Sequence, residues 1–452
     1  MTVIKKIETR RGAHLKLNGI SEKILDKTLL AVNYALKPDD FFGTIPKMCL
    51  KEGADILSGT PIFYSKKNPD IKFVSPVSGT IKTIERGPKR KIEHILIESS
   101  KKQEPVLHQV KGWSKMKIPD LKMLLMESGN WPFIHQRPYG IMANPLDTPK
   151  AIFVNTAKTD PLHEDFHFIL KKDRKEFQLG IDLLNKLVDQ PVFLGVEKSF
   201  PGYFESIDGV QHYSVKGPHP AGNLSLHIQI LCPLNMGDRI WSVNPEDVAN
   251  LGRFIDSGVY SPQRTVAISG NAIGKPKYFQ TKIGVELSPI LDKVEIKHDN
   301  VRVINGDVLT GTTSHLTDHL GYFNNLVSVI PEGNNYRMFG WLPFKDNKIL
   351  SLSNTSFSRL FNQKGFDVDT NLNGEERAIV VTGEMEKIFP LDIYPMQLIK
   401  ACMIEDIEKM EALGIYEVVP EDFGLVEYAN TSKLEVQEII RQGIELMINE
   451  VG

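Results

Sequence analysis

The pattern His163-Glu164-Asp165-Phe166-His167 has the residue types and the spacing of a zinc peptidase motif. On a helix, two histidines four residues apart lie on one face and can bind a zinc ion beside a general-base glutamate. Zinc peptidases usually carry an uncharged residue where Asp165 stands, and no later segment plainly supplies a third ligand. The charged run 171–175 that follows is typical of a solvated helix face. We interpret the pattern as the start of a surface helix and expect no metal site, with a zinc metallopeptidase as an alternative function.

Lys66 and Lys67 are a second candidate for chemistry, because a lysine in a hairpin receives the cofactor in biotinyl and lipoyl carriers. From about Pro46 to Glu98, short apolar runs are separated by glycine and proline, which is typical of a compact all-β unit. Its two halves are alike in character, and the unit resembles the barrel-sandwich hybrid of those carriers. The neighbours Asn68-Pro69 match neither attachment motif. We expect a structural domain, with a lipoyl or biotinyl carrier protein as an alternative.

The three cysteines, Cys49, Cys232 and Cys402, lie far apart in the sequence. They form neither a disulfide framework nor the cluster of thiols that an iron-sulfur centre requires. Cys402 instead lies in an apolar stripe with three- and four-residue steps, which predicts one buried helix face. The stripe consists of Ile399, Cys402, Met403, Ile407 and Met410.

The composition is that of a soluble protein with several domains. The chain has 452 residues, of which 41% are hydrophobic and 24% charged, and its formal net charge is -2. No stretch approaches the roughly 20 apolar residues of a membrane-spanning helix, and the N-terminus lacks a signal peptide's apolar core. We interpret the short basic run 88–91 as a solvated turn, so no nucleic-acid partner is expected. We expect a cytoplasmic protein.

Alternating strand and helix patterns in the middle of the chain predict an α/β domain. The expected elements are helices at 119–129, 162–189 and 245–258 and strands at 151–155 and 191–196. This alternation predicts a parallel sheet covered by helices, in a Rossmann-like domain.

The last part of the chain is expected to contain a small α+β domain and then a helical tail. The clearest strands of the α+β domain are 266–270 and 300–305. In the tail, Ser432 and Glu435 have the spacing of a capping box, which predicts a helix start at Ser432. The predicted buried face of that helix is Val436, Ile440, Ile444 and Met447.

Short phrases follow one another in a specific order over nearly the whole chain. They are Lys67-Asn68-Pro69, Phe73–Gly79, Arg86–Arg90, Ala151–Asn155, Asp160-Pro161, Gly217–Gly222, His227-Ile228, Gly306–Gly311, Gly321-Tyr322 and Val327–Gly333. In this order they resemble the A subunit of the bacterial sodium-translocating NADH:quinone reductase. We therefore expect four parts. These are an N-terminal segment with the barrel-sandwich hybrid (1–100), a linker with the Rossmann-like domain (101–260), a ubiquitin-like α+β domain of the soluble-ligand-binding type (261–343) and a mostly helical C-terminal region (344–452).

The resemblance also implies that this chain binds no redox cofactor. The family is related in fold to the NADH- and flavin-binding subunit of respiratory complex I, where a glycine-rich loop holds the flavin phosphate. The corresponding stretch here, Ser128–Pro138, has Trp131, Pro132 and Phe133 in that space. The relatives' acidic nucleotide-contacting segment is replaced by Thr156–Asp160, and their cysteine cluster by a single thiol. NADH, flavins and iron-sulfur clusters would be bound by other subunits.

The function implied by the resemblance is that of a peripheral, cofactor-free subunit of an enzyme complex. The complex oxidises NADH, reduces ubiquinone to ubiquinol and exports sodium ions. This chain would lie on the cytoplasmic face of the bacterial inner membrane, contact the membrane-embedded B subunit, and contribute to quinone access or binding and to assembly. No complete active site is expected on this chain alone, and the sodium path would lie elsewhere.

For quinone contact, the best candidate is the phrase from Gly217 to Gly222. A rigid Pro-His-Pro turn could present the imidazole of His219 to a quinone oxygen as a hydrogen-bond donor. The alternative is a turn that only shapes the edge of the sheet. Two further candidates lie where the relatives' flavin loop would be. The predicted quinone-binding residues are Gly217, Pro218, His219, Pro220, Gly222, Arg137 and Tyr139.

Overall fold

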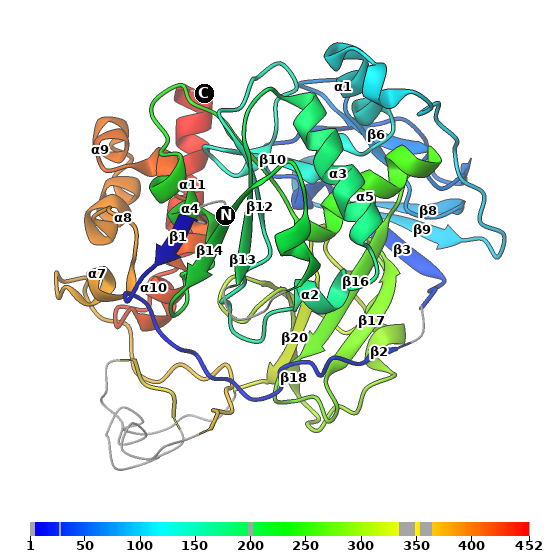
Figure 1. The fold of residues 1–452 in the computed structure, drawn as a ribbon. Coiled ribbons are helices and arrows are strands. Elements are labelled where there is room, and N and C mark those ends of the chain that lie inside the picture. Colours follow the sequence, from blue (N-terminus) through cyan, green and yellow to red (C-terminus); the bar gives the residue numbers. More distant parts are fainter. Residues whose placement is uncertain (1–4, 27–28, 198–201, 334–348, 353–363, 452) are drawn as a thin grey trace.

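The described part of the chain contains four β-sheets, helices between their strands and a group of C-terminal helices (Figure 1). The computed structural model describes residues 5–26, 29–197, 202–333, 349–352 and 364–451. Among these residues, no helix is both long and apolar enough to cross a membrane.

Two small sheets between residues 33 and 99 share one apolar core. Their orders are β3-β9-β8-β5 and β4-β6-β7. The strands are β3 (Asn33–Leu36), β4 (Pro46–Met48), β5 (Asp55–Ile56), β6 (Pro61–Ser65), β7 (Lys72–Val74), β8 (Gly79–Arg86) and β9 (Ile92–Ser99). The rings of Phe41 and Phe63 each lie 4.4 Å from that of Phe73 in this core. Lys66 and Lys67 are exposed in the hairpin between β6 and β7.

The N-terminal segment that precedes these sheets belongs to two other sheets. Strand β1 (Lys5–Glu8) pairs in parallel with a strand of the seven-stranded sheet. Strand β2 (Leu25–Asp26) pairs with a strand of the six-stranded sheet. Residues 5–26 therefore connect distant parts of the molecule, and they contribute no strand to the all-β unit.

The seven-stranded sheet has the order β1-β14-β13-β12-β15-β10-β11. Its other strands are β10 (Ile134–Arg137), β11 (Ile141–Met142), β12 (Ile152–Asn155), β13 (Val192–Glu197), β14 (Gln211–Lys216) and β15 (Ile240–Val243). Strands β12 and β13 confirm the predicted strands, and both lie in the parallel part of the sheet. The chain runs outward from β12 through β13 to β14 and then returns to β15 on the other side of β12. Strand order reverses at this point, and parallel sheets commonly bind ligands beside the carboxyl ends of strands at such a reversal.

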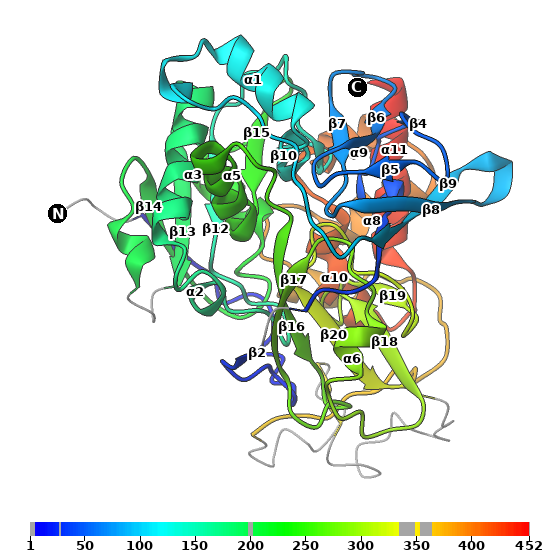
Figure 2. The same cartoon turned by 90° about the vertical axis from the view of Figure 1, so that its right-hand side faces the viewer.

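Helices cover both faces of this sheet (Figures 1 and 2). Helices α3 (Arg174–Leu187) and α5 (Pro245–Ser257) lie on one face, where they pack with Ile152 and Val154 of β12. Helix α4 (Leu224–Leu231) and the C-terminal helices pack on the other face with Phe153. Because both faces are covered, β12 is apolar along its first three residues instead of alternating with polar ones.

The predicted helices of this region are confirmed at two positions and wrong at one. Helix α1 (Ile118–Glu127) ends before Gly129, and α5 is capped by the side chain of Asn244 and ends at Gly258 in the left-handed region. The helix predicted at 162–189 is two helices, α2 (Phe166–Ile169) and α3. Aspartates favour helix starts. Asp165 accepts a hydrogen bond from Phe168 N and caps α2, and Asp173 precedes α3, so the chain restarts its helix after the break.

A mixed six-stranded sheet follows, with the order β19-β18-β20-β16-β17-β2. Its elements are β16 (Gln263–Ser269), β17 (Lys277–Lys282), β18 (Val301–Asn305), β19 (Thr312–Ser314) and β20 (Leu326–Pro331), with the short helix α6 (Ser288–Leu291) between β17 and β18. Strands β16 and β18 confirm the two clearest strands predicted there.

The C-terminal region is helical, as predicted, but two details of the prediction are wrong. Its helices are α7 (Glu384–Ile388), α8 (Pro395–Met403), α9 (Ile407–Ala412), α10 (Gly424–Ala429) and α11 (Val436–Glu450). The stripe around Cys402 is divided between α8 and α9, so it is not one helix face, although Cys402 itself is buried. The predicted cap at Ser432 is not formed, because its hydroxyl donates to Ala378 O and α11 begins at Val436. The predicted buried face of α11 is confirmed.

A fully buried ionic network joins α5 to the six-stranded sheet. The guanidinium Nη2 of Arg264 in β16 lies 2.9 Å from Asp247 Oδ1, and its Nη1 lies 3.7 Å from Glu246 Oε2. Glu246 also accepts hydrogen bonds from the backbone N and the hydroxyl of Thr265 and from the amide of Asn325. Burial raises the pKa of both carboxyl groups, and Arg264 opposes that rise. Since removing one partner leaves a buried charge uncompensated, this network specifies how the two parts fit together.

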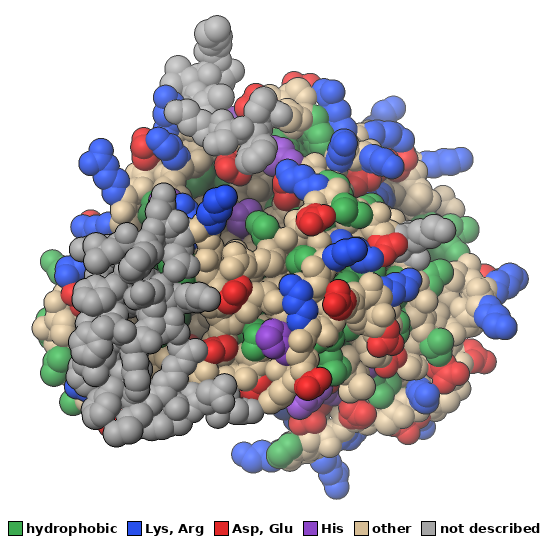
Figure 3. Space-filling view, turned by 90° about the horizontal axis from the view of Figure 1, so that it is seen from below, with side chains coloured by type: hydrophobic (Ala, Val, Ile, Leu, Met, Phe, Trp, Pro, Cys, Tyr) green, Lys and Arg blue, Asp and Glu red, His purple; other side chains and the backbone are tan. Residues whose placement is uncertain are grey.

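The surface seen from below in Figure 1 carries acidic and basic side chains side by side (Figure 3). A mixed face of this kind produces no field of a single sign.

We predict that Arg264→Met lowers the free energy of unfolding by about 3–5 kcal/mol, because Glu246 and Asp247 lose their buried counter-charge. A urea titration followed by circular dichroism and tryptophan fluorescence measures this. The matched control is Lys91→Met, which removes an exposed pair with Asp39 and changes stability by less than about 1 kcal/mol. Equal effects of the two substitutions would contradict the structural role of the network.

Candidate functional site

The candidate site begins at the carboxyl end of β12, where Asn155 organises the following turn. Its Nδ2 donates to Ala157 O at 3.1 Å and to Gly222 O at 2.8 Å, and its Oδ1 accepts from Ala157 N. The hydroxyl of Thr159 accepts a hydrogen bond from Gly222 N at 2.8 Å. A Cβ atom on Gly222 would lie 2.8 Å from Ala157 O and from Thr159, so only glycine permits this close approach. One strand end thus holds the loops after β12 and β14 together.

His219, in the second of these loops, is only 3% exposed. Its Nδ1 lies 3.3 Å from Thr159 Oγ1 and 3.6 Å from Asp160 Oδ1. Its Nε2 is buried and has no hydrogen-bond partner among the described residues. Burial lowers the pKa of His219, with partial opposition from Asp160, so the imidazole is neutral at pH 7. A neutral ring with one nitrogen unpartnered can donate to or accept from a ligand, depending on its tautomer.

Lys158 is the centre of charge in the site. Its Nζ lies 3.6 Å from Asp160 Oδ2 and 3.7 Å from Glu164 Oε1, and the Lys158 side chain is 33% exposed. Burial alone would lower the pKa of Lys158, but Glu164, Asp160 and Asp307 together raise it. Lys158 therefore stays an ammonium group, on a partly exposed side chain, beside the carboxyl groups of Asp160 and Glu164, whose side chains are 19% and 8% exposed.

The carboxyl groups of the site titrate in different ranges. Burial would raise the pKa of Asp160, but Lys158, His219 and His163 hold it below its usual value. Burial and the nearby charge of Asp160 raise the pKa of Asp307 to about 6. Environments that separate the pKa values of neighbouring acids are characteristic of groups that exchange protons. Asp307 can gain or lose a proton near neutral pH.

The loop that carries Asp307 is held on its other side by the C-terminal helices. Asp307 Oδ1 accepts hydrogen bonds from Leu309 N at 2.8 Å and Thr310 N at 3.3 Å, and its other oxygen accepts from the Thr310 hydroxyl. Gln437 of α11 donates from Nε2 to Leu309 O at 2.9 Å. The sequence phrases Asp160-Pro161, Gly217–Gly222 and Gly306–Gly311, far apart in the chain, therefore meet at one place.

The other predicted residues of the 217–222 loop have structural roles that the structure makes visible. A Cβ on Gly217 would lie 2.6 Å from Thr9 O, and His219 O accepts a hydrogen bond from Ala13 N. Pro218 O and Pro220 O accept from Ala221 N and Asn223 N, just before α4 begins. The imidazole is enclosed by these contacts, not displayed on an open turn.

Arg137 and Tyr139 lie at the end of β10 and directly after it. The carboxyl group of Asp422 accepts from Asn223 Nδ2 at 3.1 Å. Burial raises the pKa of Asp422, and the charge of Arg137 opposes that rise. Asp422 thus links Arg137 to the segment after Gly222. Tyr139 is buried against Tyr416, with ring centroids 5.9 Å apart.

The structure does not support the zinc-peptidase alternative, which needs His163 and His167 on one helix face. His163 and Glu164 precede α2, whose first residue is Phe166, so they do not share a helix face with His167. Glu164 lies by Lys158, and the ring of His167 packs 4.9 Å from that of Phe204. In the described ranges, no group of three or more His, Cys, Asp or Glu side chains is placed to bind a metal ion.

The residues expected to fill the relatives' flavin site belong to the core. Trp131, Pro132 and Phe133 form a buried 3-10 turn. Trp131 Nε1 donates to Ala143 O at 2.7 Å, and the Phe133 ring stacks on Tyr260. Burial also raises the pKa of the Cys402 thiol to about 12. The absence of a bound flavin or cluster on this chain stays a prediction.

Sequence reasoning identified His219 but missed Lys158, Thr159 and Asp307 as parts of one site. Lys158 and Thr159 could have been found from their position directly after a central parallel strand, where ligands bind. Asp307 follows Gly306, whose φ of +108° favours glycine, but its proximity to Asp160 is not visible in the sequence.

Comparisons with family models agree with these parts of the fold. Residues 7–100 match the NqrA N-terminal barrel-sandwich hybrid domain, residues 116–260 the NqrA second alpha/beta domain, and residues 265–315 the NQRA C-terminal domain. The barrel-sandwich and α/β predictions are confirmed at this level.

Curated relatives cover essentially the full chain. The A subunit of the Na(+)-translocating NADH-quinone reductase of Neisseria meningitidis serogroup A is 30% identical over 447 residues, which are 98% of this chain and 100% of that protein. The protein of the same name from Rhodopirellula baltica is 30% identical over 450 residues, 98% of each chain. A crystal structure of an NAD+-reducing NiFe hydrogenase aligns with 76% of this chain and 63% of that chain, at 11% identity and a TM-score of 0.37, which is too weak to support an argument.

We predict that Asp307 makes stability depend on pH. Its pKa is 3.8 when exposed and about 6 in the fold, so the folded state binds more protons and loses stability as the pH rises from about 4 to 6. Asp307→Asn removes this loss. The melting temperature of the variant minus that of the unsubstituted chain should therefore increase as the pH is raised from 4.5 to 7.5. Differential scanning fluorimetry measures it, and the exposed Asp299→Asn should show no such trend. A parallel pH profile in both variants would refute the assignment.

Proposed function

We propose a role for this chain inside an enzyme complex, because it belongs to the family of the A subunit of the Na(+)-translocating NADH-quinone reductase. The resemblance found in the sequence is confirmed. The chain is a subunit of that complex and is not a full catalytic unit alone. We propose that it contributes to quinone binding and to assembly, and that the complex oxidises NADH, reduces ubiquinone to ubiquinol and exports sodium ions.

The observation that carries the quinone proposal is the unpartnered Nε2 of His219, near Lys158, whose side chain is partly exposed. A quinone oxygen accepts hydrogen bonds from an N–H group, and a quinol hydroxyl donates to a ring nitrogen. The imidazole of His219 can donate to the quinone oxygen or accept from the quinol hydroxyl, and Lys158 supplies a second donor. A buried polar atom without a partner is costly, so a ligand that supplies the missing bond is stabilised there.

Proton supply supports the same proposal. Reduction of a quinone to a quinol adds two electrons and two protons. Asp307, with a pKa of about 6, exchanges protons near neutral pH, and Asp160 interacts electrostatically with Asp307 and lies 3.6 Å from Nδ1 of His219. Arg137 and the loop 217–222 would shape the neighbouring surface, since Asp422 connects them.

The finer fold assignments are also proposals. Alternation of β12, α3, β13 and β14, followed by the return to β15, supports a Rossmann-like domain within 101–260. The compact sheet of β16 to β20 supports a ubiquitin-like, soluble-ligand-binding domain within 261–343, of which residues 334–343 lie outside the described residues. We keep 1–100 and 344–452 as the first and last parts.

We propose that flavins, NADH and iron-sulfur clusters are bound by other subunits. The buried packing of Trp131 and Phe133 supports this, because these rings occupy space that a glycine-rich phosphate loop leaves open. We also propose contact with the membrane-embedded B subunit on the cytoplasmic face of the bacterial inner membrane. The lack of a spanning helix among the described residues is consistent with a peripheral position.

We predict that His219→Asn raises the KM of the assembled complex for ubiquinone about tenfold, with the kcat at saturating quinone within about twofold. Asparagine keeps a polar group near the Nδ1 position and removes Nε2, so only the ligand's bond is lost. Steady-state kinetics on complex purified from membranes measures this, with NADH oxidation by an artificial acceptor as a check on the other subunits.

His298→Asn, on an exposed histidine, is the matched control and should leave both parameters unchanged. An unchanged quinone KM in an intact His219→Asn complex would remove quinone binding from this site. Assembly would then remain as the role of the chain.

A further inference from the structure

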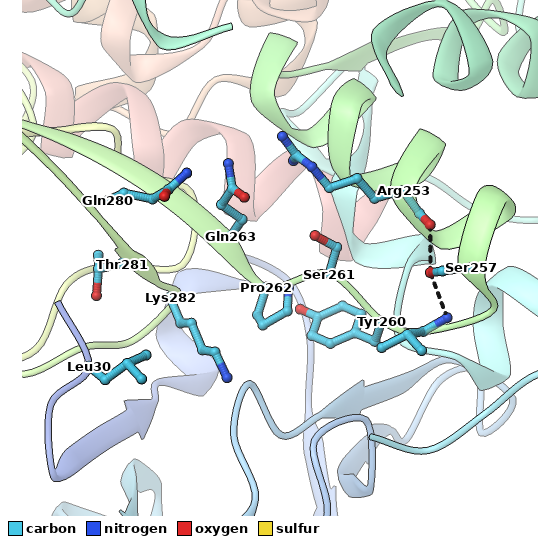
Figure 4. A pocket seen from close by; sticks show the side chains of 11 residues that line it. Leu30, Arg253, Ser257, Tyr260, Ser261, Pro262, Gln263, Gln280, Thr281 and Lys282 are labelled. Carbon is cyan, nitrogen blue, oxygen red and sulfur yellow. Dashed lines mark hydrogen bonds between the residues drawn. The ribbon is translucent and has the colours of Figure 1, made fainter. Parts of the chain in front are cut away.

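A cleft of about 340 Å³ indicates a second ligand site (Figure 4). None of the residues that line it belongs to the site around Lys158. The cleft lies where three parts of the chain meet: the N-terminal segment at Leu30, the end of α5 with the residues that follow it, and strand β17. Its lining residues are Leu30, Arg253, Ser257, Val259, Tyr260, Ser261, Pro262, Gln263, Gln280, Thr281 and Lys282. Clefts of roughly 300 Å³ or more at junctions between domains are common ligand sites.

One wall of the cleft is apolar and uncovered. Along residues 29–32, Leu29 and Ala31 are buried, while Leu30 and Val32 are 64% and 62% exposed. An alternating segment with one solvated side usually has polar residues on that side. Here both outward side chains are apolar, and Leu30 lines the cleft together with Val259 and Pro262.

All the charged residues that line the cleft are positively charged. Its lining contains two cations, Arg253 and Lys282, and no acidic residue. Arg253 is neutralised by Asp173, whose Oδ1 lies 2.8 Å from its guanidinium Nη2. In the part of the chain that the structure describes, no ion pair forms at Lys282, whose Nζ donates to Gln103 Oε1 at 3.1 Å.

Lys282 is partly buried, so its positive charge is desolvated without a compensating carboxylate. Burial accordingly lowers the pKa of Lys282. Figure 4 shows its ammonium group extending into the space between Leu30 and Tyr260. An anion placed there would restore the missing charge balance, and an apolar chain attached to it would cover Leu30.

We propose that this cleft binds a small amphiphilic anion, a carboxylate or phosphate group bearing an apolar chain, with the anion on Lys282 Nζ and the chain against Leu30, Val259 and Pro262. A neutral molecule of the same shape would contact the apolar wall but would leave the positive charge of Lys282 without a counter-charge. Because the ligand touches all three parts, its binding also holds their junction together and raises the melting temperature by mass action. Binding in this cleft does not depend on quinone binding at His219.

The test is isothermal titration calorimetry on the full chain with sodium octanoate as the probe and 1-octanol as its neutral counterpart. We expect octanoate to bind at one site per chain, Lys282→Met to weaken it at least tenfold, and Lys282→Arg to retain it. The affinity for 1-octanol should be the same in all three proteins. The matched control Lys297→Met, an exposed lysine of the same part of the chain, should behave as the unsubstituted chain.

Cosedimentation with phosphatidylglycerol vesicles distinguishes the source of the anion. Lys282-dependent binding to vesicles assigns the anion to a lipid headgroup, and Lys282-dependent octanoate binding without vesicle binding assigns it to a free ligand. The proposal is overturned if octanoate and vesicles both fail to bind, or if binding is unchanged by Lys282→Met in a chain whose circular dichroism spectrum and melting temperature are normal.

Discussion

Arg264 lies without solvent exposure between the carboxylates of Glu246 and Asp247, and the arrangement of the other parts depends on this contact. Charges in a water-free interior cannot be compensated by solvent, so a displacement of α5 against β16 that separated them would be costly. The hydrogen bonds that Thr265 and Asn325 donate to Glu246 further restrict the position of its carboxylate. These directional contacts favour the observed register of α5 against β16.

That register decides what the two candidate sites contain. The six-stranded sheet brings the Asp307 loop against the carboxyl end of β12, and the C-terminal helices hold it there through Gln437. The same junction leaves a cleft between β17, the end of α5 and the N-terminal segment. Both sites therefore lie between parts of the chain and not within one of them, which is where concave and partly desolvated surfaces arise in multidomain proteins.

The polar cluster around Lys158 suits a binding role more than electron transfer. One ammonium group faces three carboxyl groups, and the neutral imidazole of His219 is enclosed with one nitrogen unpartnered. These groups can hold and exchange protons, but they carry no electrons. Trp131 and Phe133 are core residues: Trp131 donates a hydrogen bond to Ala143 O, and the Phe133 ring stacks on Tyr260. The family membership and the site chemistry thus agree on a chain that supports a reaction completed elsewhere in the complex.

Local signals in the sequence determined a large share of the fold. Apolar runs predicted β12 and β13, Pro245 and Gly258 bounded the predicted α5, and the spacing of Val436 to Met447 predicted the buried face of α11. These succeed because hydrophobic periodicity and capping act over a few residues.

Ordered phrases likewise identified the family and pointed to His219. Only the tertiary structure decided the unused cap at Ser432, the enclosure of His219 and the meeting of Lys158, Asp160 and Asp307. Each of these depends on a partner far away in the chain, and the sequence specifies such pairings only through the packing of the whole molecule.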